Sequence, residues 1–226
     1  MDPELRVAIT GGTSGLGLAL LREFRRRGAR VAFVARTADR VDQVTSEHGG
    51  THGIVGDVAR KEDIHPIALQ ITAALGGLDV LVNNASCLGP TPLALLADID
   101  CEQFELALAT NVLAPFRLTK ALLGALSASA REGRGAVVLN VSSDAAINAY
   151  AQWGVYGASK AALRHMSNIW GEELAAEGVR FLSLDPGDMD TPLHALAVPD
   201  ADPATLKRPE TAARELADAI ARALLQ

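Results

Sequence analysis

Two side chains with complementary acid–base chemistry, Tyr156 and Lys160, stand four residues apart in the segment YGASK. Residues at this spacing share one face of a helix, so both side chains are expected to point the same way. A free phenol has a pKa of about 10, and a neighbouring ammonium group favours the phenolate, which brings a tyrosine toward acid–base work at neutral pH. An exposed helix pair is the alternative interpretation.

A serine hydroxyl is predicted to join this pair. Ser143 follows a short apolar run that reads as a strand, and Tyr156 opens the next helical pattern. A hydroxyl at the carboxyl end of a strand can reach the start of a helix across the crevice of a parallel sheet. Ser143 would then donate a hydrogen bond to the same oxygen that Tyr156 protonates. A turn or capping serine is the other interpretation, and Ser142 is an alternative for the role.

A glycine-rich turn, TGGTSGLG at residues 10–17, connects the first predicted strand to the helix that follows. Gly11 permits a tight turn, Gly15 lets the backbone approach a pyrophosphate, and Gly17 allows the helix to pack closely on the strand. The amide groups and the helix dipole then face the anion. In this position the turn predicts a dinucleotide site, with a plain glycine turn as the alternative.

The second predicted strand ends at Arg36, where an acidic residue would be expected to bind the 2′-hydroxyl of an NAD ribose. A guanidinium favours a 2′-phosphate instead, because its planar fork binds phosphate bidentately. NADP(H) is therefore the predicted cofactor; NAD(H) is possible through Asp39, which also suits the first turn of a helix. Asp57 and Val58 follow the third strand and are expected beside the adenine, unless Asp57 is an ordinary turn residue.

Short apolar, β-branched runs alternate with longer helical patterns along the whole chain. Strands are predicted at residues 5–9, 30–35, 51–55, 78–82, 136–141 and 179–184, and helices at 15–28, 38–48, 61–75, 101–131, 155–177 and 209–225. This alternation predicts an α/β fold, a Rossmann-like doubly wound parallel sheet of about six strands with helices on both faces. Residues 186–209 show little periodicity and are predicted to form a loop over a pocket.

Composition limits the classes of protein that fit. The 226 residues, 49% of them apolar, suffice for one core and not for two ordinary domains, so a single domain over residues 1–226 is expected. A net charge of −6 argues against nucleic acid or anionic lipid as partners. The acidic N-terminus predicts neither a signal peptide nor a membrane span. The two cysteines, Cys87 and Cys101, lack CxxC spacing, which agrees with a reducing compartment. A cytoplasmic location is therefore expected. No histidine grouping predicts a metal.

Jointly, the motifs resemble those of the short-chain dehydrogenases/reductases. The resemblance runs from Leu5 to about Thr191 through the glycine turn, Asp57, the NNA turn at 83–85, Asn111, Ser143, the Tyr156/Lys160 pair and the DPG at 185–187. It implies that Tyr156 is the general acid, Ser143 the carbonyl-polarising donor, Lys160 a ligand of the nicotinamide ribose and Asn111 the support of a proton-relay water. The predicted cofactor-binding residues are Gly11, Thr13, Ser14, Gly15, Leu16, Gly17, Arg36, Asp57, Val58, Asn83, Asn84, Ala85, Tyr156, Lys160, Pro186, Gly187 and Thr191.

Asn111 also has a physical reason of its own. Pro115 lies four residues further on and has no N–H, so the carbonyl of residue 111 loses its helical partner. A freed carbonyl inside a helix can hold water. A simple kink in a core helix is the other interpretation, and both can be true together.

The sequence departs from the family pattern in two places. Ser86 stands where the family's NNAG turn has its glycine, near the expected pocket wall. After the last predicted helix the sequence ends at Gln226, without the usual seventh strand and glycine-containing tail, which puts a tetramer built by that tail in doubt. A homodimer through the apolar helices 101–131 and 155–177 is expected.

The residues expected near a substrate are mostly apolar or weakly polar: Ser86, Cys87, Leu88, Ile147, Trp153, Met189, Leu193 and His194. Trp153 could equally belong to an interface or the core, and His194 to a surface loop. We predict an NADP(H)-dependent oxidoreductase that interconverts a carbonyl and an alcohol on a small, largely apolar substrate, with hydride transfer and Tyr156 as acid and base. The alternative is a non-catalytic NADP(H) sensor or regulatory dimer, which needs none of the acid–base groups. A weaker alternative function is that of an epimerase or dehydratase.

Overall fold

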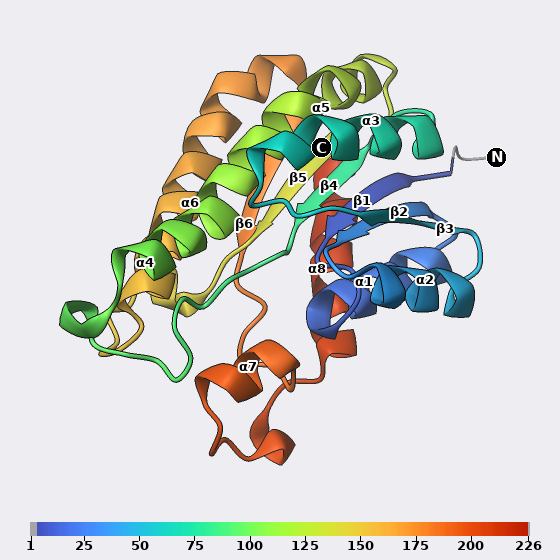
Figure 1. Cartoon of the computed structure of the whole chain (residues 1–226). Helices are drawn as coiled ribbons and strands as arrows, with labels where there is room; N and C mark the ends of the chain where they lie inside the picture. The colour runs from blue at the N-terminus through green and yellow to red at the C-terminus, as the bar shows by residue number, and fades with distance from the viewer. Residues whose placement is uncertain (1–3, 226) are drawn as a thin grey trace.

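The sheet places the carboxyl ends of six parallel strands at one edge of the molecule. The computed structural model describes residues 4–225 and contains β1 (Arg6–Thr10), β2 (Arg30–Ala35), β3 (Thr51–Val55), β4 (Val80–Asn83), β5 (Ala136–Val141) and β6 (Val179–Leu184) (Figure 1). Their order is β3-β2-β1-β4-β5-β6. The direction of winding reverses between β1 and β4, and ligands of such sheets bind outside the carboxyl ends at this switch point. The predicted Rossmann-like fold is confirmed.

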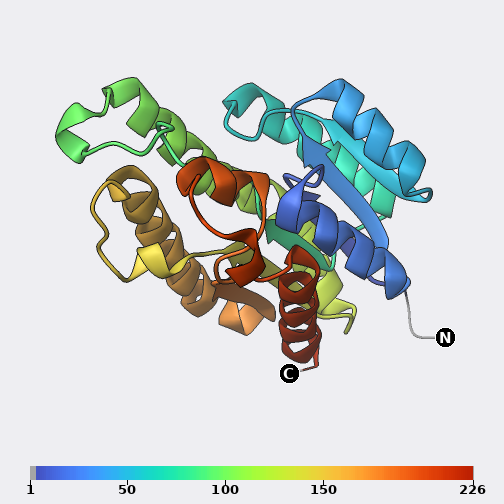
Figure 2. The ribbon, with the colours of Figure 1, turned by 90° about the horizontal axis from the view of Figure 1, so that it is seen from below.

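Helices cover both faces of the sheet, as Figures 1 and 2 show. One face carries α1 (Gly15–Arg26), α2 (Ala38–Glu47) and α8 (Pro209–Leu224), and the other carries α3 (Ile64–Leu75), α5 (Ala114–Arg131) and α6 (Gly154–Leu174). Successive residues of β1 serve the two cores in turn, with Val7 and Ile9 on the α1 side and Ala8 on the α3 side. Each fully buried valine or isoleucine side chain contributes about 1.5–3 kcal/mol to folding. The strands therefore form a stable support for the loops at their ends.

The long helix predicted at residues 101–131 is interrupted. It consists of α4 (Cys101–Leu108), a π-helical turn over Ala109–Leu113 and α5, in which Pro115 stands near the start. The N–H of Ala114 bonds to the carbonyl of Ala109, five residues back. Because Pro115 offers no N–H to the carbonyl four residues back and its ring crowds the preceding turn, the regular α-helical pattern is interrupted there.

Among the described helices, the segment Cys101–Arg131 is long and apolar enough, by length and composition, to cross a membrane. In the fold its α5 part packs on β5 and on α3. Core helices of globular proteins meet the same two criteria.

The proline-rich segment 186–209 is not wholly irregular. It contains the helix α7 (Pro192–Ala197), whose first turn is capped by the Thr191 hydroxyl, which accepts a hydrogen bond from the backbone N–H of His194 at 3.2 Å. A helix of six residues is too short for its periodicity to stand out in the sequence. Viewed from below, this segment crosses the middle of the molecule (Figure 2).

Candidate active site

A cavity of about 680 Å³ opens at the carboxyl edge of the sheet, within the usual size range of a ligand site. Its walls come from the glycine turn, from the segments after β2 to β6, and from α6 and α7. Most predicted site residues line it: Gly11, Thr13, Ser14, Gly15, Leu16, Gly17, Arg36, Asp57, Val58, Asn84, Ala85, Ser143, Tyr156, Lys160, Pro186, Gly187 and Thr191. Residues from six separate loops thus meet at one place.

Two predicted site residues do not line this cavity. Asn83 is the last residue of β4 and points to the α5 side of the sheet, where its amide donates to Asn140 at 2.9 Å and to Thr119 of α5 at 3.4 Å. Asn111 is buried in the π turn behind the cavity wall. Because motif spacing does not show which way a side chain points, neither position could be foreseen.

The glycine turn is shaped for a close backbone approach. Gly11 and Gly15 adopt positive φ values of 70° and 48°, a conformation that residues with a Cβ rarely adopt. A Cβ on Gly17 would collide with the carbonyl oxygen of Gly11 and come within 2.6 Å of the Asn84 amide. That amide donates to the carbonyls of Thr10 at 2.9 Å and Gly11 at 3.3 Å, so it braces the turn. The N-terminus of α1 beyond the turn provides amides and a dipole for a phosphate.

The cavity is also lined by a guanidinium group, that of Arg36. Arg36 follows β2, is exposed and lines the cavity. Within residues 4–225 its guanidinium makes no ion pair below 4.0 Å, in contrast to Arg6, Arg26, Arg27 and Arg134. The glycine turn, the N-terminus of α1 and this guanidinium thus border one cavity and fit a dinucleotide.

Tyr156 and Lys160 lie on one face of α6 and are both nearly completely buried, with 8% and 2% of their surfaces exposed. The Lys160 ammonium donates to the carbonyl of Val141 at 2.8 Å and lies 5.5 Å from the centre of the Tyr156 ring. Trp153 packs edge-on against the same ring, with centroids 5.7 Å apart. The shared face predicted from the spacing is present, and the exposed-pair interpretation is wrong.

Burial moves the two proton affinities in opposite directions. Desolvation raises the pKa of Tyr156 to about 12, against the smaller opposing effects of the Ser143 and Ser86 hydroxyls, because the phenolate loses its water. Desolvation lowers the pKa of Lys160 to about 8, for the same reason applied to an ammonium. The sequence led us to expect that Lys160 would lower the pKa of the phenol; in the protein alone the cost of burying the phenolate is larger.

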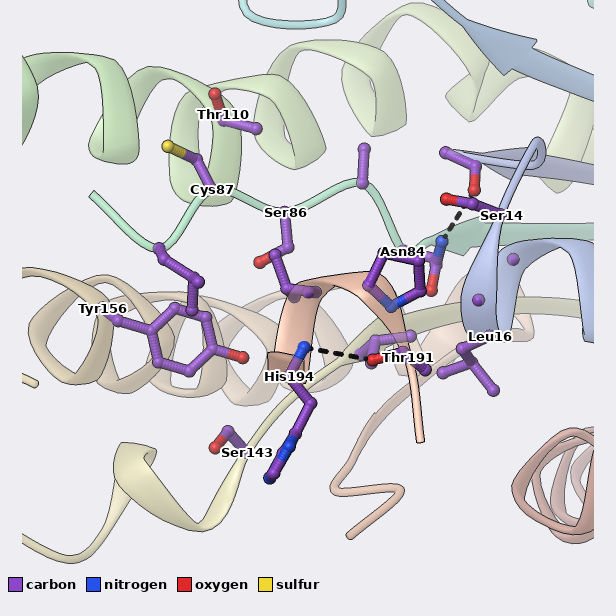
Figure 3. Close-up of a pocket in the computed structure, with 18 of the residues that line it drawn as sticks. Ser14, Leu16, Asn84, Ser86, Cys87, Thr110, Ser143, Tyr156, Thr191 and His194 are labelled. Carbon is purple, nitrogen blue, oxygen red and sulfur yellow. Dashed lines mark hydrogen bonds between the residues drawn. The ribbon is translucent and has the colours of Figure 1, made fainter. Parts of the chain in front are cut away.

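Ser143 has the capping role that the sequence analysis named as the alternative to a catalytic one. Its hydroxyl accepts from the N–H of Ala145 at 3.2 Å and so caps the turn after β5, and it donates to the Asp144 carboxylate at 3.1 Å. The same side chain lines the cavity together with Tyr156 (Figure 3). Ser142 also lines it but is more deeply buried. The cap holds the Ser143 hydroxyl in place on the side of the phenol.

Asn111 clamps the cavity wall from behind. Its side-chain oxygen accepts from the N–H of Cys87 at 2.8 Å, and its amide donates to the Cys87 carbonyl at 2.7 Å and to the Ser159 hydroxyl at 2.8 Å. These bonds tie the π turn to α6 and to the segment after β4. The segment after β4 also contains Ser86, which lines the same cavity as the glycine turn.

Several lining residues were not singled out as site residues in the sequence: Thr110, Asp144, Tyr150, Asp185 and Asp188. Asp185 follows β6 directly, and its place after a strand was the available signal. Tyr150 donates to Asp144 at 2.7 Å, a contact that needs the folded loop to exist. Of the predicted substrate residues, Ile147 is exposed and does not line the cavity. No cluster of three potential metal ligands occurs in residues 4–225.

Comparison with known proteins decides the family. The model of the short chain dehydrogenase family matches residues 6–202. The chain belongs to the short-chain dehydrogenases. It is 33% identical over 187 residues to serine 3-dehydrogenase of Agrobacterium fabrum, which covers 82% of this chain and 72% of that protein.

Solved structures of short-chain dehydrogenases and related reductases share the fold. One from Shigella flexneri, in complex with NADP, has 26% identity and a TM-score of 0.83, over 93% of this chain and 87% of that one. The 3-ketoacyl-(acyl-carrier-protein) reductase of Brucella melitensis, in complex with NADH, has 24% identity and a TM-score of 0.91, over 100% of this chain and 94% of that one. At this level of identity, the likeness concerns the fold alone. This short-chain dehydrogenase is a nicotinamide-dependent oxidoreductase that acts on CH–OH and carbonyl groups.

Proposed function

We propose that this short-chain dehydrogenase is an NADP(H)-dependent carbonyl reductase for a small, largely apolar substrate. The observation that carries the proposal is that Ser143, Tyr156 and Lys160 line the same cavity as the glycine turn at residues 10–17, which we call the glycine cradle. A sensor of the NADP(H) redox state would need the cradle but not the buried acid–base pair.

The proposed mechanism assigns each residue a physical task. The chemistry that the cofactor supplies when bound is hydride transfer to the carbonyl carbon. Tyr156 delivers the proton to the carbonyl oxygen, and its raised pKa keeps the phenol protonated and ready as an acid. With substrate bound, the Ser143 hydroxyl turns from the Asp144 carboxylate, to which it donates in the free protein, and donates to the same oxygen, where it stabilises the negative charge that develops. Lys160, close to the ring, stabilises the phenolate left behind and would hold the nicotinamide ribose.

The remaining assignments follow the residues around this centre. The glycine turn with Thr13, Ser14 and Leu16 would hold the pyrophosphate, and Asp57 and Val58 the adenine. Asn84 and Ala85 would support the nicotinamide half, with Pro186, Gly187 and Thr191 at its border. Asn111 would act through its carbonyl, which Pro115 leaves without a helical partner, as the support for a proton relay to Lys160.

The NADP preference rests on Arg36. An exposed guanidinium at the end of β2 has no ion-pair partner within residues 4–225 and lies in the groove where a 2′-phosphate would be placed. Phosphate and guanidinium form paired, charge-assisted hydrogen bonds. NAD(H) remains the second cofactor of the proposal.

The direct test is NADPH oxidation with a panel of aldehydes, ketones and α-diketones, compared between the wild type and Tyr156→Phe. We expect carbonyl-dependent turnover in the wild type and a loss of roughly 100- to 10,000-fold in the variant, the usual size of a general-acid effect. NADPH binding should stay within a few-fold. Cofactor binding without turnover of any carbonyl would favour the sensor.

We also propose a homodimer in the cytoplasm, formed through α4, α5 and α6. Exposed apolar side chains lie on these helices and on the π turn between α4 and α5, among them Phe104, Leu113, Phe116 and Ile169. Light scattering should report a dimer, and Ile169→Arg should shift it toward monomer. Leu69→Arg, at an exposed position of α3, is the matched control and should leave the mass unchanged. A monomeric wild type at all concentrations would exclude this interface.

A further inference from the structure

A lysine that does not line the cavity, Lys207, closes the loop that contains α7. Its backbone forms an isolated parallel bridge with Met189. The N–H of Lys207 donates to the carbonyl of Asp188 at 2.9 Å, and its carbonyl accepts from the N–H of Asp190 at 3.0 Å. Residues 190–206, which we call the α7 excursion, therefore leave the body of the protein and return to it at one closed neck.

The side chain of Lys207 also holds the turn that leads into this excursion. Its ammonium donates to the carbonyl of Pro186 at 2.9 Å and to the Glu215 carboxylate of α8 at 2.9 Å. An ammonium has three N–H donors, so one side chain can serve both acceptors. Nζ lies close to Gly187 as well, where a Cβ would stand 3.5 Å from it. Lys207 thus connects α8 to the turn after β6.

The Asp185 carboxylate holds the same turn from the side of β6. It accepts from the N–H of Gly187 at 2.8 Å. Gly187 is exposed and adopts a φ of 79°, and a glycine reaches many other backbone conformations at little cost. The direction of the chain at this point therefore depends on the bonds made by Asp185 and Lys207. Without the lysine, the Pro186 carbonyl loses its charged donor.

The position of this turn matters because Pro186 and Gly187 line the cavity. The proposed function assigns both residues to the border of the nicotinamide. The α7 excursion lines the cavity too, and its Leu193 packs with Tyr156 in one apolar cluster. Groups around a reacting centre must be held close to the productive geometry, and residues behind them supply that support. Lys207 is placed to do so at both ends of the excursion.

We propose that Lys207 is a positioning residue for the nicotinamide half of the cofactor. Through its bond to the Pro186 carbonyl and through the closed neck, it holds the turn and the α7 excursion against that half. The inference deepens the proposed function and rests on its placement of the nicotinamide beside Pro186 and Gly187. Loss of the ammonium should weaken the binding of the nicotinamide half and leave that of the adenosine half unchanged.

The test compares a whole cofactor with a fragment that lacks the nicotinamide half. Titration calorimetry measures the dissociation constants of NADPH and of adenosine 2′,5′-bisphosphate for the wild type, Lys207→Met, Lys207→Arg and Glu215→Gln. NADH and ADP form a second pair, so that the result does not depend on which cofactor the protein prefers. The matched control is Lys61→Met, at an exposed position of the turn Lys61–Asp63 that does not line the cavity.

We expect Lys207→Met to raise the dissociation constant of the whole cofactor about fivefold or more and that of the fragment less than about twofold, because the lost charge-assisted bond acts only beside the nicotinamide. Lys207→Arg should recover most of the affinity, since a guanidinium can donate to the same two acceptors. Glu215→Gln keeps the bond to Pro186, so both of its constants should change less than about twofold, as in Lys61→Met.

Equal weakening of the cofactor and the fragment in Lys207→Met, or no weakening of either, would overturn the inference. The same loss in Glu215→Gln would also overturn it, because the effect would then belong to the ion pair with α8. All of these measurements report binding and need no turnover. A protein whose cofactor affinity depends on Lys207 as expected, but which reduces no carbonyl, would support this inference and contradict the proposed carbonyl reductase.

Discussion

At the scale of single residues, burial sets the charge states of the groups that carry the chemistry. A phenol and an ammonium in water release their protons at similar pH, near 10. Inside this protein the pKa of Tyr156 rises to about 12 and that of Lys160 falls to about 8. The pair therefore enters the reaction as a protonated acid and a cation that can lose its proton close to neutral pH.

The sequence predicted which residues meet but not how their side chains are held. The spacing of Tyr156 and Lys160 is sufficient to place them on one helix face. The bonds of Asn111 to Cys87 and of Asn83 to Asn140 depend on side-chain directions and on loop positions that only packing determines.

The cofactor preference is testable at one residue. Arg36→Asp should lower the ratio of kcat/KM for NADPH over NADH by roughly 10- to 100-fold, because a charge-assisted phosphate contact worth about 1.5–3 kcal/mol is lost and a like charge is introduced. Steady-state kinetics with both cofactors measure the ratio. Arg40→Asp, an exposed change one helical turn further along that does not line the cavity, is the control. An unchanged ratio in Arg36→Asp would place the 2′-phosphate elsewhere.

At the scale of elements, the contact between α1 and the end of β1 forms the phosphate cradle. Gly17→Ala should raise the dissociation constant for NADPH at least about tenfold and lower the free energy of unfolding by about 1–3 kcal/mol, because the new methyl group meets the Gly11 carbonyl and the Asn84 amide. Fluorescence titration and chemical denaturation measure the two effects.

Gly124→Ala is the matched control for that prediction. Gly124 lies on the exposed side of α5, and a Cβ there meets nothing within 4 Å. The change should leave NADPH affinity unaltered and raise the free energy of unfolding by up to about 1 kcal/mol, since alanine favours the helix. Equal effects of the two substitutions would show that the cradle is not tight at Gly17.

Element boundaries were predictable where periodicity was long and unpredictable where it was short. The six strands and the six longer helical regions follow the apolar patterns. The six residues of α7 complete fewer than two turns, so local periodicity could not reveal them. Pro115 predicted a disturbance in the long helix, but the choice of a π turn depends on the packing of Asn111 against α6.

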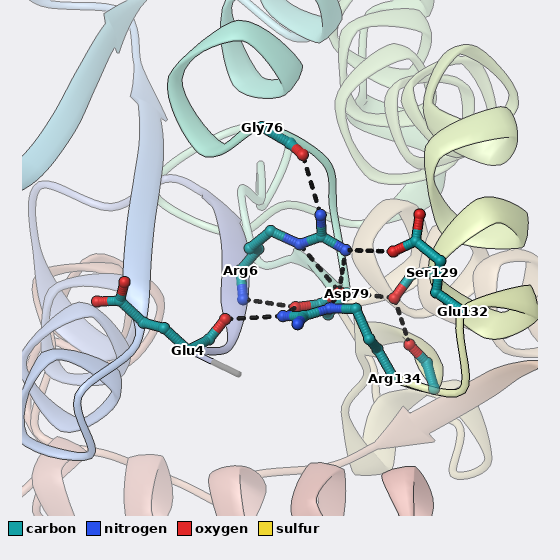
Figure 4. A network of polar contacts seen from close by, with 8 residues as sticks. Glu4, Arg6, Gly76, Asp79, Ser129, Glu132 and Arg134 are labelled. Carbon is teal, nitrogen blue, oxygen red and sulfur yellow. Dashed lines mark hydrogen bonds and ion pairs between the residues drawn. The ribbon is translucent and has the colours of Figure 1, made fainter. Parts of the chain in front are cut away.

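At the scale of the whole molecule, a buried ion network closes the amino edge of the sheet, opposite the cavity (Figure 4). The fully buried carboxylate of Asp79 receives hydrogen bonds from the side chains of Arg6, Arg134 and Ser129, the shortest at 2.6 Å. These bonds join β1, the start of β4 and the end of α5. Despite the desolvation that opposes them, they hold the pKa of Asp79 well below its ordinary range.

Asp79→Asn should lower the free energy of unfolding at neutral pH by about 3–5 kcal/mol, because two arginines lose their buried partner. The ionised carboxylate stabilises the fold fully above its unfolded pKa of about 4, and this stabilisation is lost as the pH falls toward the lower folded-state pKa. The wild type should therefore lose stability below about pH 4 more steeply than the variant. Denaturation curves from pH 3 to 7 measure both.

The control is Glu132→Gln, which removes an exposed carboxylate 3.7 Å from Arg6 and should cost less than about 1 kcal/mol. Parallel pH profiles of the wild type and Asp79→Asn would contradict the predicted pH dependence of stability.

The sequence predicted the doubly wound sheet through its alternating pattern. The Asp79 network joins residues far apart in the chain and carried no local signal. That residues 1–226 work as one domain stays a prediction.

The central claim, hydride transfer with proton delivery by Tyr156, is tested most directly by isotope transfer. NADPH deuterated at the transferred position of the nicotinamide C4 is incubated with a ketone that the wild type reduces, and the alcohol is analysed by mass spectrometry. We predict one deuterium at the carbinol carbon in the wild type and, per enzyme, at least a 100-fold slower appearance of labelled alcohol with Tyr156→Phe. Labelled alcohol formed equally fast by the variant, or alcohol without deuterium, would contradict the account.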